Sequence, residues 1–143
     1  MKILIAEDDE RPRRMMDQML RKMGYEVITS ESGRDALDKL LSPNGPRLAI
    51  LDWVMPEMSG IEVCRSLRVA REAKDVFVIL LISKDTREAL VEGLDAGADE
   101  FLTKQCSSEE LKARLRTGVR ILQLEEKLLA ARWNTRRLLY QLA

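Results

Sequence analysis

The chain has 143 residues, of which 24 are basic and 24 acidic, so its formal net charge is zero. This length suits one domain with an appended segment, and zero net charge gives no overall attraction to nucleic acid or to an anionic membrane. Two cysteines and no histidine provide neither a disulfide framework nor a typical zinc site. The N-terminus shows no secretory pattern and no stretch approaches the roughly 20 apolar residues of a membrane span, so we expect a cytoplasmic protein without a membrane segment.

Short apolar runs alternate with amphipathic segments along most of the chain. The runs predict strands at 2–6, 25–29, 48–52, 76–82 and 101–103, and the fourth run is apolar enough to be the central or most buried strand. Helical spacing predicts helices between Asp9 and Gly24, at 32–41, 60–67 and 86–96, and from Ser107 or Ser108 onwards. Five β–α repeats require parallel strands joined by right-handed crossovers, so the expected fold is a doubly wound α/β sandwich.

The last predicted helix is longer than a helix that only covers a sheet. No Gly or Pro follows Gly118, and a heptad seam with alternating spacings of three and four runs through Ile121, Leu124, Leu128, Ala131, Thr135, Leu138 and Leu142. We therefore expect a domain at 1–120 and a helical extension at 121–143 that projects and forms a two-stranded coiled coil in a homodimer. The alternative is a helix folded back onto its own domain.

Charge along this seam leaves the orientation of the coiled coil open. In a parallel pair Lys127 and Arg132 would repel, whereas Arg120 and Glu125 would attract. The distal arginines are typical of a solvated helix face, so we expect no direct binding to nucleic acid.

Reactive side chains follow the ends of four predicted strands. Glu7 and Asp8 follow the first strand, Asp52 ends the third, Ser83 follows the fourth and Lys104 follows the fifth. Because the carboxyl ends of parallel strands meet at one edge of a sheet, we expect these side chains to converge. Each alone would be an ordinary cap or surface charge, and it is their joint placement that indicates a site.

Three carboxylates at one place would repel one another unless a cation lies among them. Mg²⁺ prefers oxygen ligands, and a lysine and a hydroxyl nearby would neutralise the oxygens of a phosphoryl group. The pattern therefore predicts phosphoryl transfer with Asp52 as the covalent acceptor.

Four sequence motifs resemble those of a known protein family. ILIAEDD, LDWVMPEMSG, LLIS and GLDAGADEFLTK, spread over about residues 2–120, resemble the receiver domain of two-component response regulators. The resemblance implies a flavodoxin-like sheet of five parallel strands in the order 2-1-3-4-5. It also implies that Asp52 is phosphorylated, and that Mg²⁺ is held by Glu7, Asp8, Asp52 and the backbone carbonyl of Val54.

The resemblance further implies that Ser83 and Lys104 hold the phosphoryl oxygens and that Phe101 is an aromatic switch. Two positions depart from the family pattern. Gln105 replaces the proline that usually follows the lysine in a cis peptide bond, so a trans bond is expected and would aim Lys104 differently. Lys84 replaces a small residue, and its long side chain would overhang the acceptor site.

The expected partner is a histidine kinase or phosphotransfer protein, because the chain has no histidine of its own to donate the phosphoryl group. The stretch DTREALVEGLDAGADEFLTK and the coiled extension resemble receivers that precede cyclic-dinucleotide synthesis or phosphatase domains. The chain is therefore expected to be either a stand-alone adaptor or part of a longer regulator with a C-terminal output domain, and to accept a phosphoryl group without being an enzyme. One alternative is a degenerate receiver that dimerises without phosphorylation. A phosphatase of the haloacid-dehalogenase kind is disfavoured, because that class needs an acid at the position of Val54.

Overall fold

Strands and helices alternate through the whole fold in the computed structural model, which describes residues 1–70, 75–83 and 87–142. The strands are β1 (Lys2–Ala6), β2 (Glu26–Ser30), β3 (Leu48–Asp52), β4 (Phe77–Ile82) and β5 (Glu100–Thr103). The helices are α1 (Glu10–Lys22), α2 (Gly33–Leu41), α3 (Gly60–Val69), α4 (Arg87–Ala96) and α5 (Ser108–Leu142). Thr86, where the sequence predicts the start of a helix, lies outside the described residues.

The five strands form one parallel sheet in the order β2-β1-β3-β4-β5, which confirms the predicted doubly wound fold. β4 is buried along its whole length, as its apolar sequence predicts, but β3 takes the central place and β4 lies next to the edge strand β5. The central strand therefore is the one that ends on Asp52.

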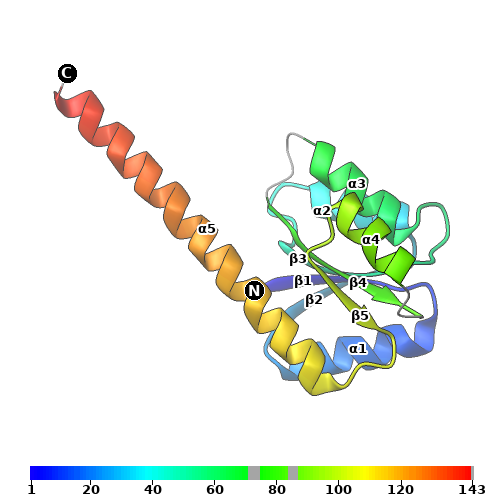
Figure 1. The fold of residues 1–143 in the computed structure, drawn as a ribbon. Coiled ribbons are helices and arrows are strands. Elements are labelled where there is room, and N and C mark those ends of the chain that lie inside the picture. The colour runs from blue at the N-terminus through cyan, green and yellow to red at the C-terminus, as the bar shows by residue number, and fades with distance from the viewer. Residues whose placement is uncertain (71–74, 84–86, 143) are drawn as a thin grey trace.

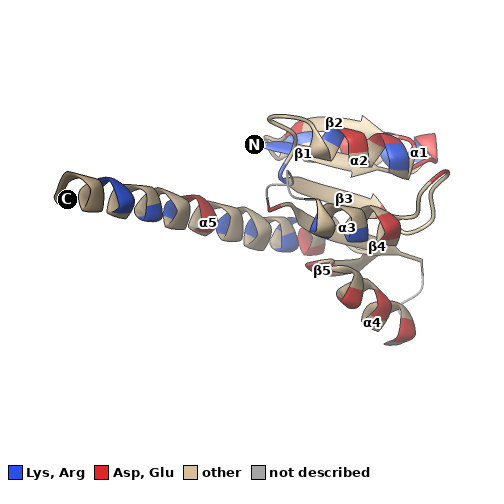
Figure 2. Cartoon of the chain, turned by 90° about the horizontal axis from the view of Figure 1, so that it is seen from above, with Lys and Arg blue, Asp and Glu red and all other residues tan. Residues whose placement is uncertain are grey.

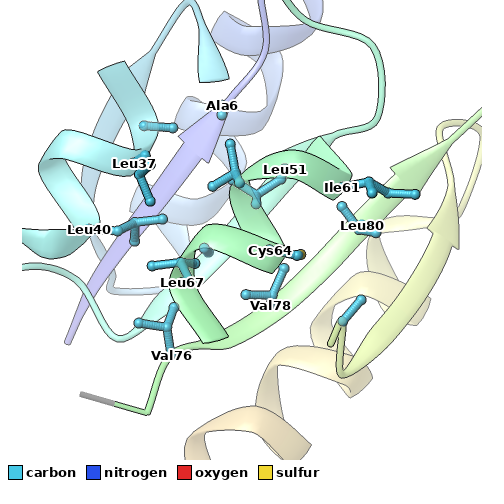
Figure 3. Packing of buried hydrophobic residues seen from close by; sticks show 14 of the residues in the cluster. Ala6, Leu37, Leu40, Leu51, Ile61, Cys64, Leu67, Val76, Val78 and Leu80 are labelled. Carbon is cyan, nitrogen blue, oxygen red and sulfur yellow. The ribbon is translucent and has the colours of Figure 1, made fainter. Parts of the chain in front are cut away.

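The sheet is covered on both faces (Figure 1): α1 and the first part of α5 lie on one side, and α2, α3 and α4 on the other. Each face of the sheet carries its own hydrophobic core, and alternate residues of each strand contribute to one core and to the other, because successive side chains point to opposite faces. Figure 3 shows the core on the face covered by α2, α3 and α4, where Leu51, Val78 and Leu80 of the sheet pack against Cys64 and Leu67 of α3. Because both faces of the sheet are closely packed, the carboxyl edge of the sheet is a rigid base for the polar loops that follow the strands.

Polar residues set the helix boundaries much as the sequence predicts. The side chain of Asp9 accepts a hydrogen bond from the backbone N–H of Arg11, and Ser107 accepts one from the N–H of Glu110 at 3.1 Å, so both act as N-caps. Gly24, with a φ of +97°, ends α1 in a conformation that side chains disfavour.

Helix α5 has two parts with different surroundings. Its first turns pack on the sheet through Leu111, Leu115, Gly118 and Leu122, which are buried. From residue 123 to residue 142 every side chain is exposed except that of Glu125, and the helix projects away from the domain (Figure 1). The alternative of a helix folded back onto its own domain is therefore wrong. None of the helices in the described part of the chain combines the length and the apolar character needed to cross a membrane.

Two contacts fix the point where α5 leaves the domain, which we call the root of α5. The ring of Phe77 lies so close to Gly118 that an added Cβ would be 2.6 Å from its Cδ1. Arg47, just before β3, pairs with Glu126 at 2.9 Å and with Glu125 at 3.4 Å. The side chain of Arg47 is only 19% exposed, so this pair of contacts is partly shielded from solvent.

Candidate functional site

The carboxyl edge of the sheet brings together three of the predicted acidic residues. Glu7 and Asp8 follow β1, and Asp52 is the last residue of the adjacent strand β3. One carboxylate oxygen from each lies within 4.8 Å of the others. Glu7 and Asp52 are buried, with 4% and 2% of their surface exposed, whereas Asp8 is open to solvent. The cluster thus has a closed inner side and an accessible outer side.

Lys104 reaches this cluster from the end of β5. Its Nζ lies 2.8 Å from Oδ2 of Asp52 and 3.4 Å from Oε1 of Glu7. The described residues contain no cis peptide bond, so the Lys104–Gln105 bond is trans, as expected, and the ammonium group nevertheless reaches Asp52. Strand pairing positions the lysine, because the backbone N–H of Lys104 donates to the carbonyl of Ile82 at 2.9 Å.

The charges at this edge perturb one another strongly. Burial, followed by hydrogen bonding and charge repulsion with Asp52, raises the pKa of Glu7 from 4.5 to about 8, against the smaller opposing effect of Lys104. Partial burial works to lower the pKa of Lys104, but the hydrogen bond to Asp52 and the negative charges of Asp52 and Glu7 outweigh it, so this pKa is raised. Without a further cation, Glu7 therefore holds a proton at neutral pH while Lys104 stays charged.

The acidic cluster fits a hard divalent cation. Oε2 of Glu7 is buried and accepts no hydrogen bond within the described part of the chain. Such an orphaned carboxylate oxygen costs free energy unless a donor or a cation satisfies it. Its position beside two further carboxylates gives the all-oxygen donor set that Mg²⁺ prefers.

Glycine lets the loop after Asp52 fold tightly over the end of β3. The N–H of Gly60 donates to the carbonyl of Trp53 at 2.9 Å, and the N–H of Trp53 donates to the carbonyl of Leu81 at 3.1 Å. A Cβ on Gly60 would stand only 2.4 Å from the backbone oxygen of Asp52. The backbone N–H and the backbone carbonyl of Trp53 both make hydrogen bonds, and these fix the chain directly after Asp52.

The remaining predicted residues lie on or just after the strands of this sheet and differ in exposure. Ser83 directly follows β4 and is exposed, and Val54, two residues after Asp52, has a side chain 70% exposed. Phe101 on β5 is half-buried and packs against α4, where a Cβ on Gly93 would lie 2.3 Å from its Cε1. Lys84, expected to overhang the acceptor site, lies outside the described residues.

Arg13 is a component of the site that the sequence analysis missed. From the first turns of α1 its guanidinium donates to the carbonyl of Glu7 at 3.0 Å and of Asp8 at 3.4 Å, and it pairs with Glu31 at 3.3 Å. It therefore holds the backbone of the acidic loop in place. Only its position within one helical turn of Asp9 hinted at this contact, and an arginine there is ordinary.

Comparison with known proteins gives one consistent result. Residues 3–116 match the family described as response regulator receiver domain. The chain is 40% identical over 119 residues to the response regulator MprA of Mycolicibacterium vanbaalenii, an alignment that covers 83% of this chain and 50% of MprA. A similar match, 39% identical over 119 residues, is found with MprA of Mycobacterium bovis. The chain spans about half the length of these curated relatives.

Solved structures show the same relationship. A response regulator from Chloroflexus aurantiacus superposes with a TM-score of 0.76 at 30% identity, covering 82% of this chain and 95% of that one. The chemotaxis protein CheY4 of Vibrio cholerae gives a TM-score of 0.74 at 31% identity, with coverages of 81% and 96%. A response regulator/GGDEF domain protein gives 0.78 at 28% identity, and there the match covers 86% of this chain and 50% of that chain. The chain therefore belongs to the family of response regulator receiver domains of two-component systems.

Proposed function

We propose that the chain is a phospho-accepting receiver and that Asp52 is the residue phosphorylated. A carboxylate oxygen of Asp52 attacks the phosphorus of a phosphohistidine on a kinase or phosphotransfer partner. A P–O bond forms, the P–N bond breaks, and the imidazole leaves with the electron pair, so that an acyl phosphate remains on Asp52. The observation that supports this best is the buried carboxylate of Asp52 with Lys104 at 2.8 Å and two further acids within ligand distance.

In this proposal Glu7, Asp8, Asp52 and the backbone carbonyl of Val54 hold Mg²⁺. The ion would supply the positive charge that offsets phosphoryl oxygens next to three carboxylates. Binding it requires Glu7 to lose its proton, which links metal affinity to pH. Lys104, already hydrogen-bonded to Asp52, would take the other side of the phosphoryl group.

The response to phosphorylation would involve Ser83 and Phe101. The hydroxyl of Ser83 moves towards the acyl phosphate, and the ring of Phe101 follows into the space that opens. Because the ring packs against α4, its movement changes the surface made by α4, β5 and α5. Residues 1–120 act as the receiver and 121–143 as the extension that carries the signal to a second copy, and to an output domain if the full-length protein has one.

Phosphorylation can be tested by intact mass after incubation with Mg²⁺ and a small phosphodonor such as acetyl phosphate. Wild type should gain one phosphoryl group, and Asp52→Asn should gain none. Asp9→Asn is the matched control, because it makes the same change on an exposed residue and keeps a good helix cap. Equal phosphorylation of wild type and Asp52→Asn would refute the assignment.

The dimer is tested separately by sedimentation with and without Mg²⁺ and beryllofluoride. We expect the association of wild type to change on addition of both and that of Asp52→Asn to remain constant. The second candidate function is a receiver that is not phosphorylated, and it is motivated by Gln105, which stands where the family usually has a proline. A wild-type chain that is dimeric, takes up no phosphoryl group and ignores both reagents would be a constitutive dimerisation module.

A further inference from the structure

The seam residues of α5 lie on the side of the helix turned away from the domain. Leu111, Leu115, Gly118 and Leu122 face the sheet, and at 100° per residue the seam lies about 140° away from them around the axis. Its large residues are open to solvent, from 38% at Ile121 to 84% at Leu142. A second helix can therefore lie along the whole seam without displacing the receiver domain.

Charge is distributed unevenly along this projecting helix. Its acidic residues are Glu125 and Glu126, next to the root of α5, and no acid follows them up to Leu142. The distal part carries four basic residues instead: Lys127, Arg132, Arg136 and Arg137. In Figure 2 the part of α5 between its last red turn and the C-terminus carries blue turns and no red one. A parallel pair would set four positive charges beside four, whereas an antiparallel pair turns this basic end towards the part of the other helix that carries Glu125 and Glu126.

We infer that two copies of this chain pair through the seam in antiparallel orientation, with Leu128 of each copy opposite Ala131 of the other. The inference rests on the proposed homodimer and specifies its geometry. In this register the helices overlap from about Thr117 to Leu142, roughly 39 Å, and the two receiver domains lie at opposite ends.

The charges flanking the seam select this register. In an antiparallel coil the residues that directly follow Leu124 and Ala131 on the seam flank the same side of the interface, which brings Glu125 of each copy to Arg132 of the other. A shift of one heptad in one direction would place Arg132 against Arg132, and in the other direction Glu125 against Glu125. The parallel arrangement gives two attractive contacts between Arg120 and Glu125, but also two repulsive ones between Lys127 and Arg132.

The sizes of the seam residues point to the same arrangement. The antiparallel register sets Leu128 against Ala131, Leu124 against Thr135 and Ile121 against Leu138. The two small seam residues, Ala131 and Thr135, therefore each meet a leucine. A parallel coil would stack Ala131 on Ala131 and Thr135 on Thr135 in successive layers. Those two layers would be underpacked, since interiors tolerate few voids.

The root of α5 is compatible with this pairing. Arg47 makes its shorter contact with Glu126, at 2.9 Å, and the longer one with Glu125, at 3.4 Å. The side chain of Glu125 keeps 34% of its surface exposed, so it remains accessible to Arg132 of the second copy. The contacts of Arg47 with Glu125 and Glu126 thus hold α5 in the orientation about its own axis that leaves the seam facing away from the domain.

One substitution separates the two orientations by the sign of its effect. Arg132→Glu would place a second carboxylate against Glu125 in the antiparallel dimer, which should weaken dimerisation by roughly tenfold for the two pairs. In a parallel dimer the same change would turn the repulsion with Lys127 into attraction and tighten it. Arg137→Glu is the control, because it changes the same charge on the outer face and should alter the dissociation constant little. Sedimentation equilibrium of the full chain measures all three, and tighter dimerisation of Arg132→Glu would overturn the inference.

Disulfide trapping gives an independent readout in a Cys106→Ser background, where Cys64 remains buried. Ile121→Cys and Leu138→Cys chains should each stay uncrosslinked alone and form a mixed disulfide when combined, because only the antiparallel pair brings these positions together. Disulfides within each variant alone would overturn the orientation and leave the dimer standing. A chain that sediments as a monomer at all concentrations would overturn the dimer and the inference with it, while the phosphorylation of Asp52 is judged separately by mass.

Discussion

The fold strongly raises the pKa of the Glu7 carboxyl group. It is buried beside Asp52, and its pKa is raised to about 8 from an ordinary value of 4.5. A carboxyl group whose pKa is higher in the fold than in the unfolded chain stabilises the fold by binding a proton. This contribution is complete below about pH 4.5 and disappears as the pH rises through about 8. Lys104 limits the loss, because its positive charge partly offsets the ionised pair.

The titration of Glu7 predicts that thermal stability without metal and affinity for Mg²⁺ change in opposite directions with pH. In the absence of divalent cations, thermal stability should fall as the pH rises from about 6 to about 8, since Glu7 ionises next to Asp52. Mg²⁺ affinity should rise over the same interval, because the ion replaces the proton. Glu7→Gln keeps the side chain neutral and should remove the metal-free trend. Thermal melts and Mg²⁺ titrations across this pH range check both expectations, and parallel trends for wild type and Glu7→Gln would contradict them.

The candidate site could be predicted from the sequence to the extent that it depends on strand ends. Asp52 and Lys104 converge because each closes a strand of a parallel sheet, which the apolar runs already indicate. The depth of Glu7 and the contacts of Arg13 could not be predicted in this way. They depend on how side chains from α1 pack over the edge, and neither hydrophobic pattern nor spacing carries that information.

At the scale of elements, the turn between β3 and α3 brings the backbone of Gly60 close to that of Asp52. Gly60→Ala would place a methyl group 2.4 Å from the backbone oxygen of Asp52, which cannot rotate away. We expect a loss of about 2–3 kcal/mol in the free energy of unfolding, together with weaker phosphorylation.

Gly24→Ala is the comparison for this prediction. Gly24 has a φ of +97° and no atom within 4 Å of an added Cβ, so only backbone strain of about 1 kcal/mol is expected. Urea denaturation of both variants tests the difference. Equal losses would show that the close approach at Gly60 is relieved by movement of the loop.

Helix α5 shows where a pattern of apolar residues is ambiguous. Leu122 and Ile121 are adjacent, yet one is buried against the sheet and the other belongs to the exposed seam. The sequence contains both stripes, one for the domain and one for the seam, and it cannot tell which part of the helix the sheet is long enough to cover. The structure settles this through Phe77 and Arg47, which mark the root of α5 at the amino ends of β4 and β3.

At the scale of the whole molecule, the distal helix makes few contacts with the domain, so we expect it to contribute little to folding. A chain ending at Lys127 keeps Leu111, Leu115, Leu122 and both contacts of Arg47, so its free energy of unfolding as a monomer should change by less than about 0.5 kcal/mol. Dimerisation should be lost. A chain ending before Ser108 removes three buried leucines and should not fold. Circular dichroism melts and sedimentation distinguish these outcomes, and a dimer that persists without the distal helix would show that another surface associates.

The root of α5 also gives the molecule a mechanical property. From Leu122 to Leu142 the helix extends roughly 30 Å beyond its last buried residue, so a tilt of about 5° at the root displaces the tip by about 2.5 Å. Arg47 and Phe77 act as the fulcrum of this lever arm, and they stand at the amino ends of the two strands whose carboxyl ends carry Asp52 and lead to Ser83. We therefore expect a small adjustment of β3 or β4 that tilts the root of α5 to produce a larger displacement at the C-terminal end of the helix.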